Sequence, residues 1–127
     1  MSYTIKNLRE VEDKAPSFGI GEVQSARFAH YDLGAERTGL ALMGVKPGCR
    51  QAFAHRHDEA EEIYVVLSGT GRLKLDDEVV EVKPLDAIRV APSVARQFEA
   101  DDEGLELLAL GPRHEGDGDV IKEGIFD

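Results

Sequence analysis

The sequence predicts an all-β protein whose short strands form a sandwich or a barrel. Apolar residues alternate with polar ones in short runs, and almost no stretch has the spacing of an amphipathic helix. Gly, Pro and Asp separate these runs, with turn signals about every eight to twelve residues. This spacing favours antiparallel strands joined by tight turns over a parallel sheet.

The two ends of the chain differ from its middle. Residues 1–36 are predicted to form an N-terminal arm and the first strand, which is expected over 24–29; Pro16 and Gly19 interrupt any helix in the arm. Residues 112–127 begin with a polar, glycine-rich stretch and are predicted to form a surface loop or tail. We treat the whole chain as a single domain.

Between these ends, residues 37–111 are predicted to form the barrel core from eight further strands. Their expected ranges are 39–45, 50–57, 62–68, 71–75, 78–82, 87–90, 96–99 and 105–110. Pro47 and Gly48 supply the turn before the second of these strands, and Gly69 and Gly71 are expected to turn the chain between the third and the fourth. The pair at 76–77, Asp-Asp, is expected to close a hairpin.

The run 63–67, Ile-Tyr-Val-Val-Leu, is apolar on both of its alternating faces. Both faces of such a strand should be covered. In a barrel one face fills the interior, and the other packs beneath a second sheet, the N-terminal segment or a partner subunit. We therefore predict a homodimer, with cover from the same chain as the alternative.

Size, charge and cysteine content exclude several classes of function. A chain of 127 residues can bury one core. The chain has 15 Lys and Arg against 25 Asp and Glu, and the resulting net charge of −10 disfavours nucleic acid and anionic membrane surfaces as partners. The single cysteine and the lack of a secretory signal pattern predict a cytoplasmic protein. No apolar run is long enough to span a bilayer.

Two histidines and a glutamate form the candidate metal site. His55 and His57 are one residue apart on a predicted strand, so both imidazoles share a face, with Cα atoms about 6.7 Å apart. Gln51 and Phe53 lie on that face too, and Glu62 begins the next strand. Two imidazoles and one carboxylate are a facial ligand set for Fe, Mn, Ni or Zn as divalent ions, with positions left for water or substrate.

The stretch 48–69 resembles the first signature motif of the cupin superfamily, G-x5-H-x-H-x3/4-E-x6-G. The gaps from His57 to Glu62 and from Glu62 to Gly69 match, whereas six residues instead of five separate Gly48 from His55. The resemblance extends over about residues 37–110. It implies a small single-domain cupin: an antiparallel jelly-roll barrel, commonly dimeric, with a metal inside the barrel mouth.

The second cupin motif is altered in this chain. Aligned on the stretch 84–86, it places Arg96 where the family has its third histidine, and it lacks the usual later asparagine, which is Ala100 here. A guanidinium stays protonated and offers only hydrogen-bond donors, so Arg96 cannot bind a metal. The four-ligand set implied by the resemblance is therefore reduced to His55, His57 and Glu62.

Three hypotheses remain open for this site. In the first, His55, His57 and Glu62 hold a divalent metal, while Arg96 turns outward or binds the anionic group of a ligand. In the second, Arg96 takes the place of the cation and pairs with Glu62, which leaves a metal-free pocket. In the third, the two histidines are only packed.

Two functions follow from these hypotheses. One is a metal-dependent enzyme, a dioxygenase or an isomerase, that acts on a small organic molecule. The other is a non-catalytic protein that binds a small anionic ligand through Arg96. The candidate ligand-binding residues are Arg96, Gln51, Phe53, Tyr64 and Phe98.

Overall fold

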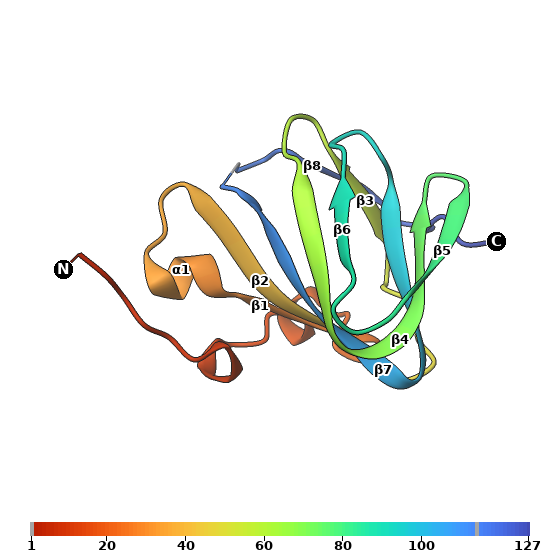
Figure 1. Cartoon of the computed structure of the whole chain (residues 1–127), viewed down its shortest axis with the longest axis horizontal. Coiled ribbons are helices and arrows are strands. Elements are labelled where there is room, and N and C mark those ends of the chain that lie inside the picture. The colour runs from red at the N-terminus through yellow and green to blue at the C-terminus, as the bar shows by residue number, and fades with distance from the viewer. Residues whose placement is uncertain (1, 114) are drawn as a thin grey trace.

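Antiparallel strands curl into a jelly-roll barrel in the computed structural model of the chain, which describes residues 2–113 and 115–127 (Figure 1). The all-β prediction is confirmed; Met1 and, within the predicted tail, His114 lie outside the described residues. The strands are β1 (Gln24–Phe28), β2 (Thr38–Val45), β3 (Ala54–His57), β4 (Glu62–Leu75), β5 (Glu78–Val82), β6 (Ala87–Val90), β7 (Arg96–Pro112) and β8 (Gly118–Ile121). Short helical segments are η1 (Leu8–Glu10), η2 (Pro16–Phe18) and α1 (Ala29–Leu33). Within the described residues, no helix is long and apolar enough to cross a membrane.

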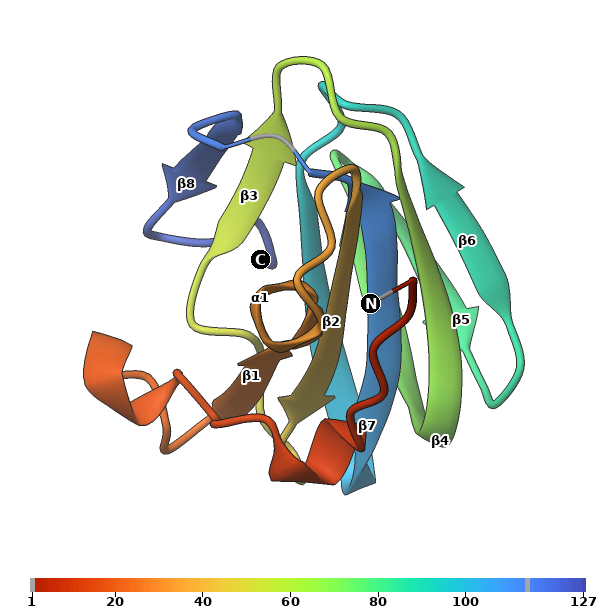
Figure 2. The same cartoon turned by 90° about the vertical axis from the view of Figure 1, so that its left-hand side faces the viewer.

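Strand β7 joins the parts of the barrel. The strands lie in the order β1-β2-β7-β3-β8, and β4 pairs with β7 as well as with β5 and β6. The later part of β7 lies between β2 and β4, and its first residue, Arg96, pairs with His55 of β3. Figure 2 shows β3 and β8 on one side of the barrel and β4, β5 and β6 on the other.

The core lies inside the barrel, on the inner faces of β4 and β7. Tyr64 and Val66 of β4 are 4% and 0% exposed, and they pack with Phe98 and Leu107 of β7. The N-terminal arm is attached to β1, because the backbone N–H of Lys14 donates to the carbonyl of Ala26 (2.8 Å). Asp13 accepts from the backbone N–H of Ala26 (2.9 Å), so both backbone polar groups of Ala26 bind the arm.

The prediction of a turn at Gly69 and Gly71 is wrong. Both glycines lie inside β4, at shifts in its register with β7. A Cβ atom on Gly69, whose φ is +80°, would lie 1.8 Å from the carbonyl oxygen of Gly104, and one on Gly71 would lie 2.1 Å from that of Glu99. These glycines let the backbones of two strands approach closely at a bulge, a role that a glycine signal shares with a turn.

Three other elements differ from the prediction. The strands expected over 96–99 and 105–110 are one strand, β7, because Gly104 adopts a φ of +78° within the strand and does not end it. The strand expected over 50–57 is regular only from Ala54, and Arg50 makes an isolated bridge to Glu99. Helix α1 follows β1 directly, and its five residues are too few to show a helical period in the sequence.

The predicted polar tail contains a strand. Residues 118–121 form β8, which pairs with β3 so that His57 lies opposite Gly118 and His55 lies opposite Val120. A short edge strand with three exposed residues carries no apolar alternation, which is why the sequence indicated a loop. The strand places this part of the chain beside the two histidines.

Candidate functional site

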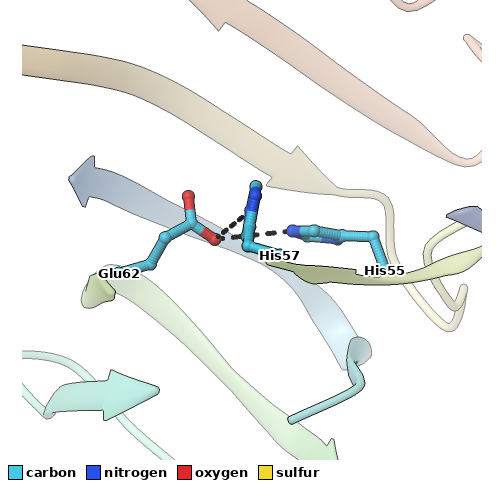
Figure 3. A group of neighbouring side chains, drawn as sticks. All are labelled: His55, His57 and Glu62. Atoms are coloured by element: carbon cyan, nitrogen blue, oxygen red, sulfur yellow. Dashed lines mark hydrogen bonds and ion pairs between the residues drawn. The ribbon is translucent and has the colours of Figure 1, made fainter. Parts of the chain in front are cut away.

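His55, His57 and Glu62 converge on one point at the end of the barrel. The two histidines project from β3, with ring centroids 5.2 Å apart and ring planes at 87°, and Glu62 is the first residue of β4 (Figure 3). The Nε2 atoms of His57 and His55 lie 3.1 Å and 3.5 Å from Oε1 of Glu62. The structure thus brings together the three residues predicted from the sequence as a metal site.

Glu62 is held as a carboxylate by its neighbours. Its Oε1 atom also accepts hydrogen bonds from the Tyr64 hydroxyl (2.6 Å) and from Nη1 of Arg96 (2.9 Å). Burial alone would raise the pKa of Glu62, but the hydrogen bonds from His55, His57 and Tyr64 outweigh it and hold that pKa well below its ordinary value. Burial and the charge of Glu62 raise the pKa of Tyr64 well above its ordinary value, so its hydroxyl keeps its proton.

Arg96 points inward and is anchored by the backbone of the loop before it. Its side chain is 0% exposed, and Nε donates to the carbonyl of Val94 (2.9 Å). Nη2 donates to the carbonyls of Ala91 (2.8 Å) and Pro92 (3.3 Å), while Nη1 donates to Glu62. Arg96 therefore does not turn outward, and it has no exposed donor to offer an anionic ligand. Its ion pair with Glu62 is the contact expected from the second hypothesis.

Asp117 is a residue of this site that sequence reasoning missed. Its carboxylate accepts the backbone N–H groups of Asp58, Glu59 and Ala60 at 2.9–3.1 Å, in the loop that connects the histidine strand to Glu62. Oδ2 of Asp117 lies 3.4 Å from Nδ1 of His57, without the geometry of a hydrogen bond. Asp117 stands in a Gly-Asp-Gly-Asp stretch that has the composition of a solvated loop, so no local pattern marks it.

A cavity of about 410 Å³ opens beside the three residues. Gln51, Phe53 and Tyr64, which the sequence predicted as ligand-binding residues, line it together with His55, His57 and Glu62. The other two predicted residues, Phe98 and Arg96, are not among its lining residues. Phe98 is 1% exposed and packs edge-on against Tyr64 in the core, with ring centroids 5.2 Å apart.

The donor set fits a divalent transition metal. The candidate ligand atoms of His55, His57 and Glu62 lie within 4.8 Å of one another, whereas ligands of one metal ion lie roughly 3–3.5 Å apart, so small side-chain movements would close the set. Among the described residues, one buried side-chain nitrogen or oxygen atom has no hydrogen-bond partner, and this atom is Nδ1 of His57. If Nε2 of His57 binds a metal, the proton resides on Nδ1 and faces the carboxylate of Asp117, as is usual for metal-bound histidines.

Comparison with known protein families agrees with the geometry. The profile of the cupin domain family matches residues 41–111, which include both histidines, Glu62 and Arg96. This chain belongs to the cupin family. An uncharacterized protein of Methanocaldococcus jannaschii is 36% identical to this cupin over 55 residues. This stretch spans 43% of the chain and 44% of that relative.

Solved structures show the same fold over nearly the whole chain. A cupin protein from Bacteroides fragilis is 22% identical, with a TM-score of 0.71 over 100% of this cupin and 98% of that chain. The polyketide cyclase RemF from Streptomyces resistomycificus is 20% identical, with a TM-score of 0.76 over 98% and 87% of the two chains. At these identities the likeness concerns the fold, including the N-terminal arm.

Proposed function

We propose that this cupin holds a divalent transition metal ion, Fe, Mn, Ni or Zn, through His55, His57 and Glu62, and that it binds or transforms a small organic molecule in the adjoining cavity. The observation that carries this proposal is the convergence of two imidazoles and one carboxylate within 4.8 Å at the wall of a cavity. A metal bound there would supply Lewis-acid or redox chemistry with positions open to a ligand. An enzyme of this kind would be a dioxygenase or an isomerase.

The surrounding residues would prepare the site for a cation and a ligand. Tyr64 donates to Glu62 and so fixes the carboxylate against the histidines. Asp117 orders the loop between His57 and Glu62, which sets the distance between these two ligands. Arg96 neutralises Glu62, and its fixed positive charge lowers the affinity of the set for a dication compared with a site that has a histidine at this position.

The second candidate function is a metal-free binding protein, and the ion pair between Arg96 and Glu62 favours it. In this case Arg96 takes the place of the cation, and the ligand is held by the cavity walls. Binding of an anionic ligand through Arg96 lacks support, because the guanidinium is buried and its donors point to Glu62 and to backbone carbonyls. Metal content separates the two candidates.

The test is the metal content of protein purified from medium supplemented with each of the four metals. We expect about one metal ion per chain in the wild type, as a single site would hold, and its loss in the double variant His55→Ala, His57→Ala. His30→Ala is the matched control, because His30 contacts the backbone of Leu40 and lies outside the ligand set. Bound metal should raise the melting temperature, and a chelator should reverse the increase.

A wild type that stays metal-free under all four conditions would contradict the metal site and leave the metal-free binding protein. Arg96→His then gives a second measurement. It adds the imidazole that the family motif has at this position, so it should create metal affinity where the wild type has none and increase the affinity where the wild type has some.

We also propose that this cupin is a homodimer in the cytoplasm. The outer face of β4 supports the dimer, because Ile63 and Leu67 are 42% and 38% exposed in the single chain. The proposal of a cytoplasmic location rests on the single cysteine, Cys49, which can form no disulfide within the chain. Measurements of mass in solution and cell fractionation test the two parts separately.

A further inference from the structure

The cavity beside His55 and His57 is walled mainly by apolar and aromatic side chains. The chain has five Phe and three Tyr, and five of these eight residues line this one cavity. They are Phe18, Phe28, Tyr31, Phe53 and Tyr64. Ile20, Leu40, Met43 and Val120 add aliphatic surface. Walls of this kind stabilise the flat faces and edges of an aromatic ligand.

The side-chain oxygens of the two glutamines that line the cavity are already bound to the protein. Oε1 of Gln51 accepts the backbone N–H of Phe98 (3.0 Å), and Oε1 of Gln24 accepts that of Ala52 (2.7 Å). A ligand with many hydroxyl groups, such as a sugar, would have to exchange its bonds to water for few partners here. That exchange costs affinity, because each unpaired polar group loses its hydration.

The described lining of the cavity offers phosphate groups a single permanently charged cation. Arg113 is the only Lys or Arg among its described lining residues. Its Nη1 donates to the carbonyl of Ala35 (2.7 Å), its Nη2 donates to Glu115 (2.5 Å), and its guanidinium lies 4.9 Å from the centre of the Tyr31 ring. A phosphorylated ligand would have to compete with Glu115 for this one guanidinium, because no other Lys or Arg is among these described lining residues.

The candidate metal site forms one cluster of polar side chains in the wall, whereas the other charged or imidazole lining residues and Gln24 each have a protein partner. The polar cluster comes from β3 (His55 and His57) and the start of β4 (Glu62 and the Tyr64 hydroxyl). The apolar wall beside it comes from β1 (Phe28) and β2 (Leu40 and Met43). β2 and β4 lie on either side of β7, and Figure 2 shows β3 to one side of these strands. A ligand that fits this distribution is apolar over most of its surface and polar at one end.

We infer that the ligand class of this cavity is a planar aromatic molecule of two or three fused rings that directs a hydroxyl or carbonyl oxygen toward His55, His57 and Glu62. The volume of about 410 Å³ lies within the range of cavities that enclose small organic ligands. The inference deepens the proposed function, and it rests on that proposal only where the polar end of the ligand meets the metal ligands. The apolar walls act independently of a metal.

The test compares 2-naphthol with glucose 6-phosphate by calorimetric titration of the full chain, in metal-loaded and in chelator-treated protein. We expect 2-naphthol to bind at least about tenfold more tightly than glucose 6-phosphate in both forms. Tighter binding of glucose 6-phosphate, or no binding of 2-naphthol to either form, would overturn the inference.

Two wall variants test where the probe binds. Phe53→Ala removes one aromatic wall and should weaken 2-naphthol binding about tenfold or more. Met43→Gln keeps the volume of the wall but makes it polar, and it should weaken binding as well. Val79→Ala, on an exposed position of β5, is the control and should have no effect. Unchanged affinity in both folded wall variants would show that the probe binds elsewhere and contradict the inference.

Metal analysis of the same samples separates this inference from the proposed function. If the protein carries no metal but binds 2-naphthol with the expected preference, the proposed metal site fails and the ligand class stands. If the protein carries about one metal ion per chain, as a single site would, and prefers glucose 6-phosphate, the metal site stands and the ligand class fails.

Discussion

At the scale of single residues, the pair of Arg96 and Glu62 determines the charge of the site. Arg96 is completely buried, and its Nη1 atom lies 2.9 Å from Oε1 of Glu62. A buried guanidinium needs a negative partner, and a buried carboxylate needs a positive one. The pair therefore has no net charge of its own, and a dication would enter beside a fixed positive charge.

Removal of Arg96 tests this coupling. Arg96→Ala should lower the free energy of unfolding by about 3 kcal/mol, because it leaves the carboxylate of Glu62 without its cation and opens a gap in the packing. Urea denaturation measures the loss. In the Glu62→Gln background, Arg96→Ala should lower the free energy of unfolding by clearly less than it does in the wild type. Strictly additive losses would show that the two side chains do not interact.

Asp117 acts on the site through the loop that it orders and through His57. Asp117→Ala should weaken metal binding about tenfold to a hundredfold, because three backbone N–H groups and Nδ1 of His57 lose the neighbouring carboxylate. Metal affinity is measured by competition with a chromophoric chelator, and stability is measured in parallel.

Two further variants separate orientation of the histidine from general stability. Asp117→Asn keeps one carbonyl oxygen for the loop but removes the carboxylate. Compared with Asp117→Ala, it should therefore restore more of the lost stability than of the lost metal affinity. Asp119→Ala, at an exposed position of β8 two residues later, is the matched control and should leave metal affinity unchanged. Equal affinity in wild type and Asp117→Ala would contradict a positioning role for Asp117.

At the scale of elements, the close approach of β4 and β7 shapes the barrel. Gly69→Ala should destabilise the protein by more than about 2 kcal/mol, because the new Cβ would meet the carbonyl oxygen of Gly104 at a positive φ. Gly48→Ala is the matched control: its φ of +69° is similar, but nothing lies within 4 Å of the new Cβ, so we expect a loss of about 1 kcal/mol. Thermal unfolding compares the two variants. Equal losses would show that the contact between the strands is not tight.

At the scale of the whole molecule, one apolar stripe lies on the outer surface of the barrel. Ile63 and Val65 of β4 lie directly opposite Leu110 and Leu108 of β7, and Leu67 continues the row on β4. Ile63 and Leu67 are exposed, and the other three side chains are partly so. The prediction that both faces of this strand are covered thus holds within the single chain only for the inner face.

A second copy of the chain is the cover that we predict for the stripe. Leu67→Glu should convert a dimer into a monomer, because it places a charge in the centre of an apolar interface. Light scattering coupled to size-exclusion chromatography gives the mass. Val79→Glu, a change of similar kind at a side chain of β5 that is 51% exposed, should leave the mass unchanged. A wild type that is already a monomer at high concentration would contradict the dimer.

Local sequence patterns predict the all-β class, the strand that carries His55 and His57, and the position of Glu62 at the start of the next strand. These features depend on alternation and on short spacings, which neighbouring residues encode. Three other features depend on the folded chain: where Arg96 points, that Gly69 lies in a strand, and that Asp117 reaches the loop before Glu62. Each of these depends on contacts between residues far apart in the chain, and the same local pattern is compatible with either outcome: a glycine serves a turn or a bulge, and a polar stretch forms a loop or an edge strand.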